Sequence, residues 1–152
     1  MGLTGNMLGD IESIPTEQEM IIQSGAYVAS IGDITLDTQW QGFKRGIFGS
    51  SLFMLKTVGT GEIFVNAYGG IIQKELKEDE TMTIDNYHLV AMSGTISYDI
   101  RKHGNLKTTI FGGEALVIEV KGPGDVFLQT KNIMSLQDQS HRFCQTENNN
   151  RN

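Results

Sequence analysis

The stretch FGSSLFMLKTVGTGEIFVN at residues 48–66 is nearly repeated at residues 111–129, which read FGGEALVIEVKGPGDVFLQ. With a shift of 63 residues the two stretches align without a gap, and six of the 18 positions from 47 to 64 are identical to their counterparts. Most of the other exchanges preserve volume and polarity. Because self-similarity at a fixed period indicates repeated structural units, we interpret the chain as two related β units, at about residues 20–76 and 77–139.

Both copies place a Gly-x-Gly segment between two apolar runs, and this pattern predicts a hairpin in each copy. Pro123 and Gly124 suit positions i+1 and i+2 of a type II turn, whose second position requires positive φ. Gly61 can supply the same positive φ in the first copy. The Phe-Gly element before each hairpin is interpreted as an aromatic anchor beside a close backbone approach. The residues assigned to these turns and anchors are Phe48, Gly49, Gly59, Gly61, Phe64, Phe111, Gly112, Gly122, Pro123, Gly124 and Phe127.

The pattern of apolar residues predicts an all-β fold. Most apolar residues alternate or form short runs rich in β-branched and aromatic residues, and these runs end at Gly, Asn or Asp. A strand start about every ten residues is typical of a sandwich or barrel. We therefore expect repeated antiparallel β units that form a sandwich or a barrel-like ring segment. The predicted strands are residues 19–23, 26–30, 34–38, 52–58, 62–66, 70–76, 81–85, 88–93, 96–101, 115–121 and 125–130.

The composition indicates one globular domain with a polar end. The chain has 152 residues, of which 39% are hydrophobic and 20% are charged, as is usual for a folded domain. We assign residues 1–139 to a single all-β domain and residues 140–152 to a polar tail that we expect to be disordered. The net charge of -6 disfavours binding to nucleic acid, because nucleic-acid binders usually carry a basic patch.

The sequence also predicts the cellular compartment of the protein. Its single cysteine, Cys144, cannot form a disulfide within the chain, which fits a reducing compartment. The first residues lack the basic and apolar segments of a secretory signal. No segment approaches the roughly 20 apolar residues that span a bilayer. We therefore expect a cytoplasmic protein without a membrane anchor.

Residues that commonly carry chemistry do not occur at catalytic or metal-binding spacings. The histidines His88, His103 and His141 lie far apart in the sequence, which does not match a known zinc motif. Ser50 and Ser51 lack the G-x-S-x-G elbow that presents a hydrolase nucleophile, and they are interpreted as turn residues. We predict that the protein is not an enzyme and needs neither a cofactor nor a metal.

Four further features have a structural and a functional interpretation, and the structural one is favoured in each case. His88 either pairs with the carboxylate of Asp85 or is a rim histidine held by a turn. Trp40 is more often a core or interface anchor than a stacking platform for a ligand. Gly59-x-Gly61 lacks the third glycine of a dinucleotide-binding motif. The acidic cluster, which lacks the sequence of a calcium loop and is interpreted as a solvated loop, comprises Glu75, Glu78, Asp79 and Glu80.

Several segments together resemble the altered inheritance of mitochondria protein 24 family. The segments are IIQSGAYVAS, DTQWQ, GIFGSSLFMLK, GTGEIFVNAYGGI, ELKEDETMTIDNYHLVAM and LKTTIFGGEALVIEVKGPGDVFLQT, and the resemblance covers roughly Gly9 to Thr130. It implies an all-β fold similar to that of the tryptophan RNA-binding attenuation protein, with repeats in one chain in place of separate subunits. It also implies a ring-like homo-oligomer. The family has no established catalytic residues, so none is transferred to this chain.

Two departures from the family pattern bear on assembly. Family members usually have another repeat before the GDI segment, and Ser50-Ser51 replaces the Gly-Glu pair that is kept at Gly113-Glu114. If the first repeat is absent, a strand edge is left open, and open edges pair with other chains. We therefore expect a homo-oligomer rather than a monomer.

The sequence predicts a non-catalytic, homo-oligomeric β module that acts as a scaffold or binding protein for an unidentified small molecule or protein. The alternative is a small-ligand-binding protein with clefts between its β units, in which RNA is disfavoured by the acidic balance. A barrel enzyme of cupin type is a weaker third interpretation.

Overall fold

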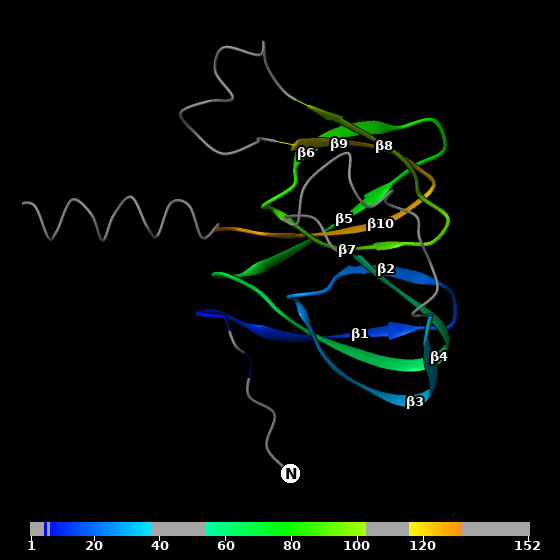
Figure 1. Ribbon diagram of the computed structural model, residues 1–152. Helices are drawn as coiled ribbons and strands as arrows, with labels where there is room; N and C mark the ends of the chain where they lie inside the picture. The colour runs from blue at the N-terminus through cyan, green and yellow to red at the C-terminus, as the bar shows by residue number, and fades with distance from the viewer. Residues whose placement is uncertain (1–4, 6, 38–53, 103–115, 132–152) are drawn as a thin grey trace, which may run out of the picture.

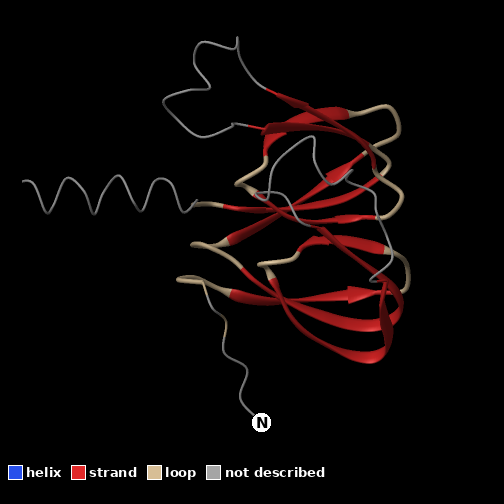
Figure 2. Cartoon of the chain, viewed as in Figure 1, coloured by secondary structure: helices blue, strands red, loops and turns tan. Residues whose placement is uncertain are grey.

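The computed structural model describes residues 5, 7–37, 54–102 and 116–131, and every regular element within these ranges is a β-strand (Figures 1 and 2). All pairings between these strands are antiparallel. The predicted all-β fold is therefore confirmed. The strands are β1 Ile11–Thr16, β2 Met20–Gln23, β3 Tyr27–Asp37, β4 Met54–Asn66, β5 Ile71–Leu76, β6 Thr81–Asp85, β7 Leu89–Ser93, β8 Ser97–Lys102, β9 Leu116–Lys121 and β10 Gly124–Gln129.

The strands form two sheets. Seven strands make a curled sheet in the order β1-β4-β2-β7-β10-β5, with β3 also paired to β4. The other sheet has three strands in the order β6-β9-β8. In Figure 1 this small sheet lies at one end of the molecule, and β1, β3 and β4 lie at the opposite end. The arrangement agrees with the expected sandwich or barrel-like fold.

The strand pairings of the first half of the chain correspond to those of the second half. β4 pairs with β1, β2 and β3. The consecutive strands β9 and β10 together make the matching pairings, because β10 pairs with β5 and β7 while β9 pairs with β6 and β8. We call β1–β4 unit A and β5–β10 unit B. The sequence places residues 70–76 in the first unit, whereas the pairing of β5 with β10 places them in the second.

The two predicted hairpins are wrong. β4 runs unbroken through Gly59 and Gly61, and β9 and β10 belong to different sheets. The Gly-x-Gly segment is instead a corner. In unit A it lies where β4 passes from its pairing with β2 to its pairing with β1, and in unit B it joins β9 to β10. The predicted strands 26–30 and 34–38 are likewise one strand, β3.

The corner glycines are required because the backbones approach closely there. A Cβ on Gly59, at φ +131°, would lie 1.9 Å from the carbonyl oxygen of Asp33, and one on Gly122 would lie 2.3 Å from that of Lys77. Gly61 and Gly124 have positive φ, as the sequence predicts. The type II turn itself is wrong, because Gly124 has a φ of +145°, far from the value of about +80° at the second central position, and begins β10.

Each unit contributes side chains to the core of the other. The core of unit B contains Ile21 and Met54 from unit A, and the core of unit A contains Val90, Ala91 and Phe127 from unit B. The joint between the units is the pairing of β2 with β7. This mutual burial makes the two units interdependent. The anchors Phe48, Gly49, Phe111 and Gly112 and the predicted tail 140–152 lie outside the residues that the structure describes.

Candidate functional site

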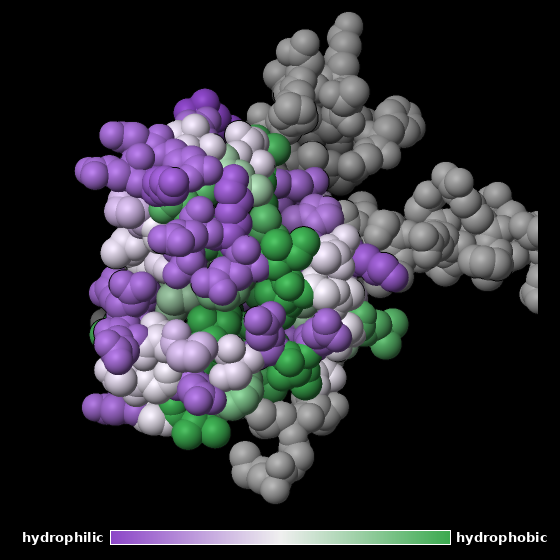
Figure 3. Space-filling view, turned by 180° about the vertical axis from the view of Figure 1, so that it is seen from behind, coloured by the Kyte–Doolittle hydropathy of each residue, from purple (hydrophilic) through white to green (hydrophobic). Residues whose placement is uncertain are grey.

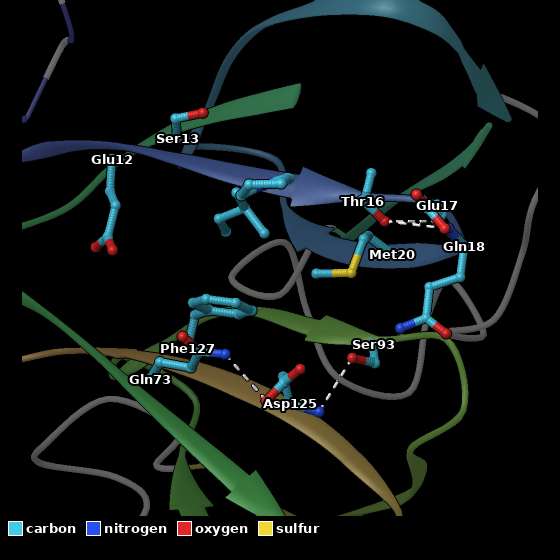
Figure 4. Close-up of a pocket in the computed structure, with 12 residues that line it drawn as sticks. Glu12, Ser13, Thr16, Glu17, Gln18, Met20, Gln73, Ser93, Asp125 and Phe127 are labelled. Atoms are coloured by element: carbon cyan, nitrogen blue, oxygen red, sulfur yellow. Dashed lines mark hydrogen bonds between the residues drawn. The ribbon is translucent and has the colours of Figure 1, made fainter. Parts of the chain in front are cut away.

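A cleft of about 470 Å³ lies at the junction of the two units (Figure 4). On one side it is bounded by β1 and the turn that leads into β2, and on the other side by β5, β7 and β10. The lining residues are Glu12, Ser13, Ile14, Pro15, Thr16, Glu17, Gln18, Met20, Gln73, Ser93, Asp125 and Phe127.

The cleft has an apolar base and an acidic rim. Ile14, Met20 and Phe127 are 4%, 2% and 5% exposed and belong to the core of unit A. Glu12 and Glu17 on the rim are exposed. Lys, Arg, His and Cys do not occur among the described lining residues. The electrostatics of the cleft therefore favour a cationic group over an anionic one.

Hydrogen bonds hold the polar side of the cleft in place. The Gln73 side chain donates to Asp125 Oδ1 over 3.0 Å, and the backbone N–H of Asp125 donates to Ser93 Oγ over 3.0 Å. Thr16 Oγ1 donates to the carbonyl oxygen of Gln18 over 2.9 Å. Figure 4 shows these bonds and places the Phe127 ring between β1 and the Gln73–Asp125 bond. These bonds fix the positions of the Gln73, Asp125 and Thr16 side chains in the lining.

A buried side-chain amide occupies the end of the repeated stretch in each unit. Asn66 is 1% exposed and Gln129 is 5% exposed. Gln129 Oε1 accepts from the N–H of Tyr68 over 3.0 Å, and its Nε2 donates to the carbonyl oxygen of Tyr87 over 2.6 Å. Asn66 makes the matching pair of bonds with the N–H of Met7 and the carbonyl oxygen of Asp10. The sequence signal was a polar residue that ends an apolar run in both copies, but no role was predicted for it.

His88 is held at the turn between β6 and β7. Its backbone N–H donates to the carbonyl oxygen of Asp85 over 2.9 Å, and its ring Nδ1 lies 2.9 Å from the carbonyl oxygen of Gln129. The Asp85 carboxylate accepts from the N–H of Tyr87. These contacts favour the interpretation of His88 as a histidine held by a turn.

The acidic cluster forms ion pairs across the surface. Asp79 lies 2.6 Å from Lys121 Nζ, and Glu80 lies 3.2 Å from Lys74 Nζ. The hydrogen bond from Lys121 lowers the pKa of Asp79, and the hydrogen bond from the Lys77 backbone lowers the pKa of Glu80. Within the described residues no group of three His, Cys, Asp or Glu side chains could hold a metal ion. These contacts are those of a charged surface loop.

The other candidates from the sequence lie outside the described residues. They are Trp40, Ser50, Ser51, His103, His141 and Cys144. Within the described ranges, no helix is long and apolar enough to cross a membrane.

Comparison with known proteins places the chain among relatives of similar fold. A family model described as "Mitochondrial biogenesis AIM24" matches residues 1–131. An uncharacterised protein of Streptococcus pyogenes serotype M6 is 29% identical over 152 residues, which cover 98% of this chain and 61% of that protein. A crystal structure of a Streptococcus pyogenes protein is similar with a TM-score of 0.75 and 29% identity, over 91% of this chain and 62% of that one. The chain thus spans about three fifths of the length of these relatives.

Proposed function

The chain belongs to the mitochondrial biogenesis AIM24 family, as its sequence motifs predict, and on that premise we propose that it is a non-catalytic, self-assembling binding module. Its ligand site is the cleft at the junction of units A and B. The ligand is a small molecule, or a side chain of a partner, that combines an apolar body with a cationic group.

The shape and lining of the cleft carry this proposal. Its volume of about 470 Å³ falls within the range of about 300–1,000 Å³ that is usual for small-molecule sites. Ile14, Met20 and Phe127 offer an apolar base for the body of the ligand. Glu12 and Glu17 can attract its positive charge. The same carboxylates disfavour phosphate groups, and therefore RNA.

The lining residues support binding rather than catalysis. An activated Ser or Thr nucleophile needs a base within hydrogen-bond reach, whereas the Thr16 hydroxyl donates to the carbonyl oxygen of Gln18 and the Ser93 hydroxyl accepts from the backbone N–H of Asp125. The Asp125 carboxylate accepts a hydrogen bond from Gln73. Glu12 and Glu17 are exposed to solvent, where their charge attracts a ligand without being desolvated.

We expect apolar amines to raise the midpoint of thermal unfolding, and matched carboxylates to leave it unchanged. Phenethylamine and phenylacetate form a suitable pair of probes, since they share a ring and differ in charge. The double variant Glu12→Gln/Glu17→Gln should weaken amine binding by up to about fivefold, because an ion pair with an exposed carboxylate contributes about 0.2–1 kcal/mol. Both residues are replaced because they lie at opposite ends of the cleft (Figure 4), so that the amine pairs with one of them at a time. The matched control is Glu78→Gln, which alters an exposed carboxylate outside the cleft.

Two results would contradict the ligand proposal. If a broad panel of amines, amino acids and nucleotides leaves the midpoint unchanged, the cleft is not a small-molecule site. If phenylacetate binds as well as phenethylamine, the assignment of a cationic ligand is wrong.

A further inference from the structure

Five strands of the described ranges pair with one other strand only, namely β1, β3, β5, β6 and β8. Two of these edge strands, β3 and β6, lie at opposite ends of the molecule. Within the described residues, β3 pairs with β4 and β6 pairs with β9, and each has no second strand beside it. Figure 1 places β3 at one end and β6 at the other. Open strand edges present unpaired backbone groups that can pair with another chain.

The joint between units A and B shows what these edges are shaped to accept. In that joint β2 pairs with β7, with Met20 opposite Ser93, Ile21 opposite Met92 and Ile22 opposite Ala91. In the correspondence between units, the counterpart of β2 is β6 and the counterpart of β7 is the first half of β3. Each open edge therefore corresponds to one side of a joint that is already formed inside the chain.

We propose that β6 of one copy pairs with β3 of a second copy, in the manner of the β2·β7 joint. This inference rests on the proposed self-assembly and specifies its geometry.

The register follows from the correspondence between strands. β6 corresponds to β2 with a shift of 62 residues. Met20 of β2 lies opposite Thr57, and Met82 of β6 lies opposite Val120, which is the counterpart of Thr57 in the repeated stretch. β3 corresponds to β7 with the same shift, because Ala29 of β3 is paired with Phe64 and Ala91 of β7 is paired with its counterpart, Phe127. The resulting register pairs Met82 with Ile31, Thr83 with Ser30, and Ile84 with Ala29.

The burial of corresponding residues supports this pairing. Val90, Ala91 and Phe127 are 0%, 0% and 5% exposed, because they fill the core of unit A across the joint. Their counterparts Val28, Ala29 and Phe64 are only half-buried. The largest difference lies at the edge itself, where Ile31 is 59% exposed and its counterpart Ser93 is 1% exposed.

Pairing with a second copy also completes the small sheet. Inside the chain, the joint produces the strand order β3-β4-β2-β7-β10-β5. If β6 of one copy pairs with β3 of the next, the sheet β8-β9-β6 continues into β3-β4-β1 of that copy, which is the corresponding order. A second copy is thus the partner whose edge matches in strand order and register. Because the two edges differ, the contact is head-to-tail and forms a ring if the rotation closes.

The proposed contact is less apolar than the joint it resembles. Thr83 stands where β2 has Ile21, and Asp85 stands where it has Gln23. Hydrophobic burial stabilises an interface in proportion to the apolar area removed from water. Copies should therefore associate reversibly, while units A and B within one chain stay joined.

The first test replaces an apolar edge residue by a charged one. Ile31→Lys should raise the protein concentration needed for half-assembly by at least about tenfold, since a lysine on an edge strand protects that edge against pairing. Its matched control is Ile72→Lys, because Ile72 is 55% exposed on β5 and lies outside the proposed contact. Equal assembly of both variants, measured by light scattering, would overturn the edge assignment.

The second test reads the register and the polarity of the contact. In a Cys144→Ser background, chains with Ser30→Cys are mixed with chains with Thr83→Cys and are oxidised in air. The mixture should form a disulfide-linked pair of chains, because directly opposite residues on paired strands lie close enough for a disulfide. Mixing Ser30→Cys with Thr81→Cys, two residues out of register, should give a much lower yield.

Each outcome of the second test is decisive. Cross-linking of either single-cysteine chain with itself would show a symmetric contact and overturn the head-to-tail pairing. An uncross-linked mixture, under conditions where light scattering shows assembly, would mean that assembly uses another surface. A chain that stays monomeric throughout would instead overturn the proposed self-assembly itself.

Discussion

Replacing Gly59 by alanine is expected to lower the free energy of unfolding by about 3 kcal/mol, since a residue with a Cβ is strained at a φ in this region and must also displace a neighbouring backbone. Gly59 has a φ of +131°, and a Cβ there would lie 1.9 Å from the carbonyl oxygen of Asp33. That oxygen belongs to the paired strand β3 and cannot rotate away as a side chain could. Urea denaturation of the variant measures the loss.

Gly70→Ala is the matched control for this prediction. A Cβ on Gly70 would meet its nearest neighbour, Asp10 Oδ2, at 3.6 Å, which is ordinary contact. We expect the stability of this variant to stay within about 0.5 kcal/mol of the parent chain. If Gly59→Ala is equally harmless, the corner in β4 is not held by a close backbone approach, and the strand could turn there in another way.

Replacing Gln129 by leucine is expected to cost about 3 kcal/mol of stability, because two backbone groups lose their partners while volume is nearly preserved. The N–H of Tyr68 and the carbonyl oxygen of Tyr87 both bond to the Gln129 side chain. These bonds hold the segments that enter β5 and β7 against the end of β10. Thermal unfolding followed by circular dichroism measures the loss.

Gln73→Leu separates the effect of the buried amide from that of a glutamine in general. Gln73 is exposed and makes a side-chain bond to Asp125, so its replacement should change stability by about 0.5 kcal/mol or less. A loss at Gln129 no greater than the loss at Gln73 would show that the amide does not fasten these segments.

The sequence predicts most of the strands and the repeated stretch, but it misidentifies the corners. Glycine with positive φ serves both a tight turn and a strand that passes close to another backbone. The local pattern around Gly59 and Gly61 is the same in both cases. What decides between them is the pairing of β4 with β3 on one side and with β1 and β2 on the other. The strand β1, which includes Pro15, was missed because proline interrupts a strand pattern and is tolerated mainly at sheet edges.

The cleft could not be predicted from the sequence beyond the expectation of a site between units. Of its lining residues, Phe127 alone had been singled out, and as a structural anchor. Glu12 and Glu17 line the same cleft as Gln73 and Asp125 because β2, which follows β1 in the chain, pairs with β7 of the other unit. Their proximity therefore follows from long-range pairing and not from any motif.

The central proposal is that copies of the chain assemble when β6 of one copy pairs with β3 of the next. Light scattering of the parent chain over a range of micromolar concentrations tests it most directly. We predict a molar mass that rises with concentration from the single-chain value of 16.8 kDa towards a multiple of it, as expected for head-to-tail contacts between copies. A mass that stays at 16.8 kDa across the whole range would contradict the proposal.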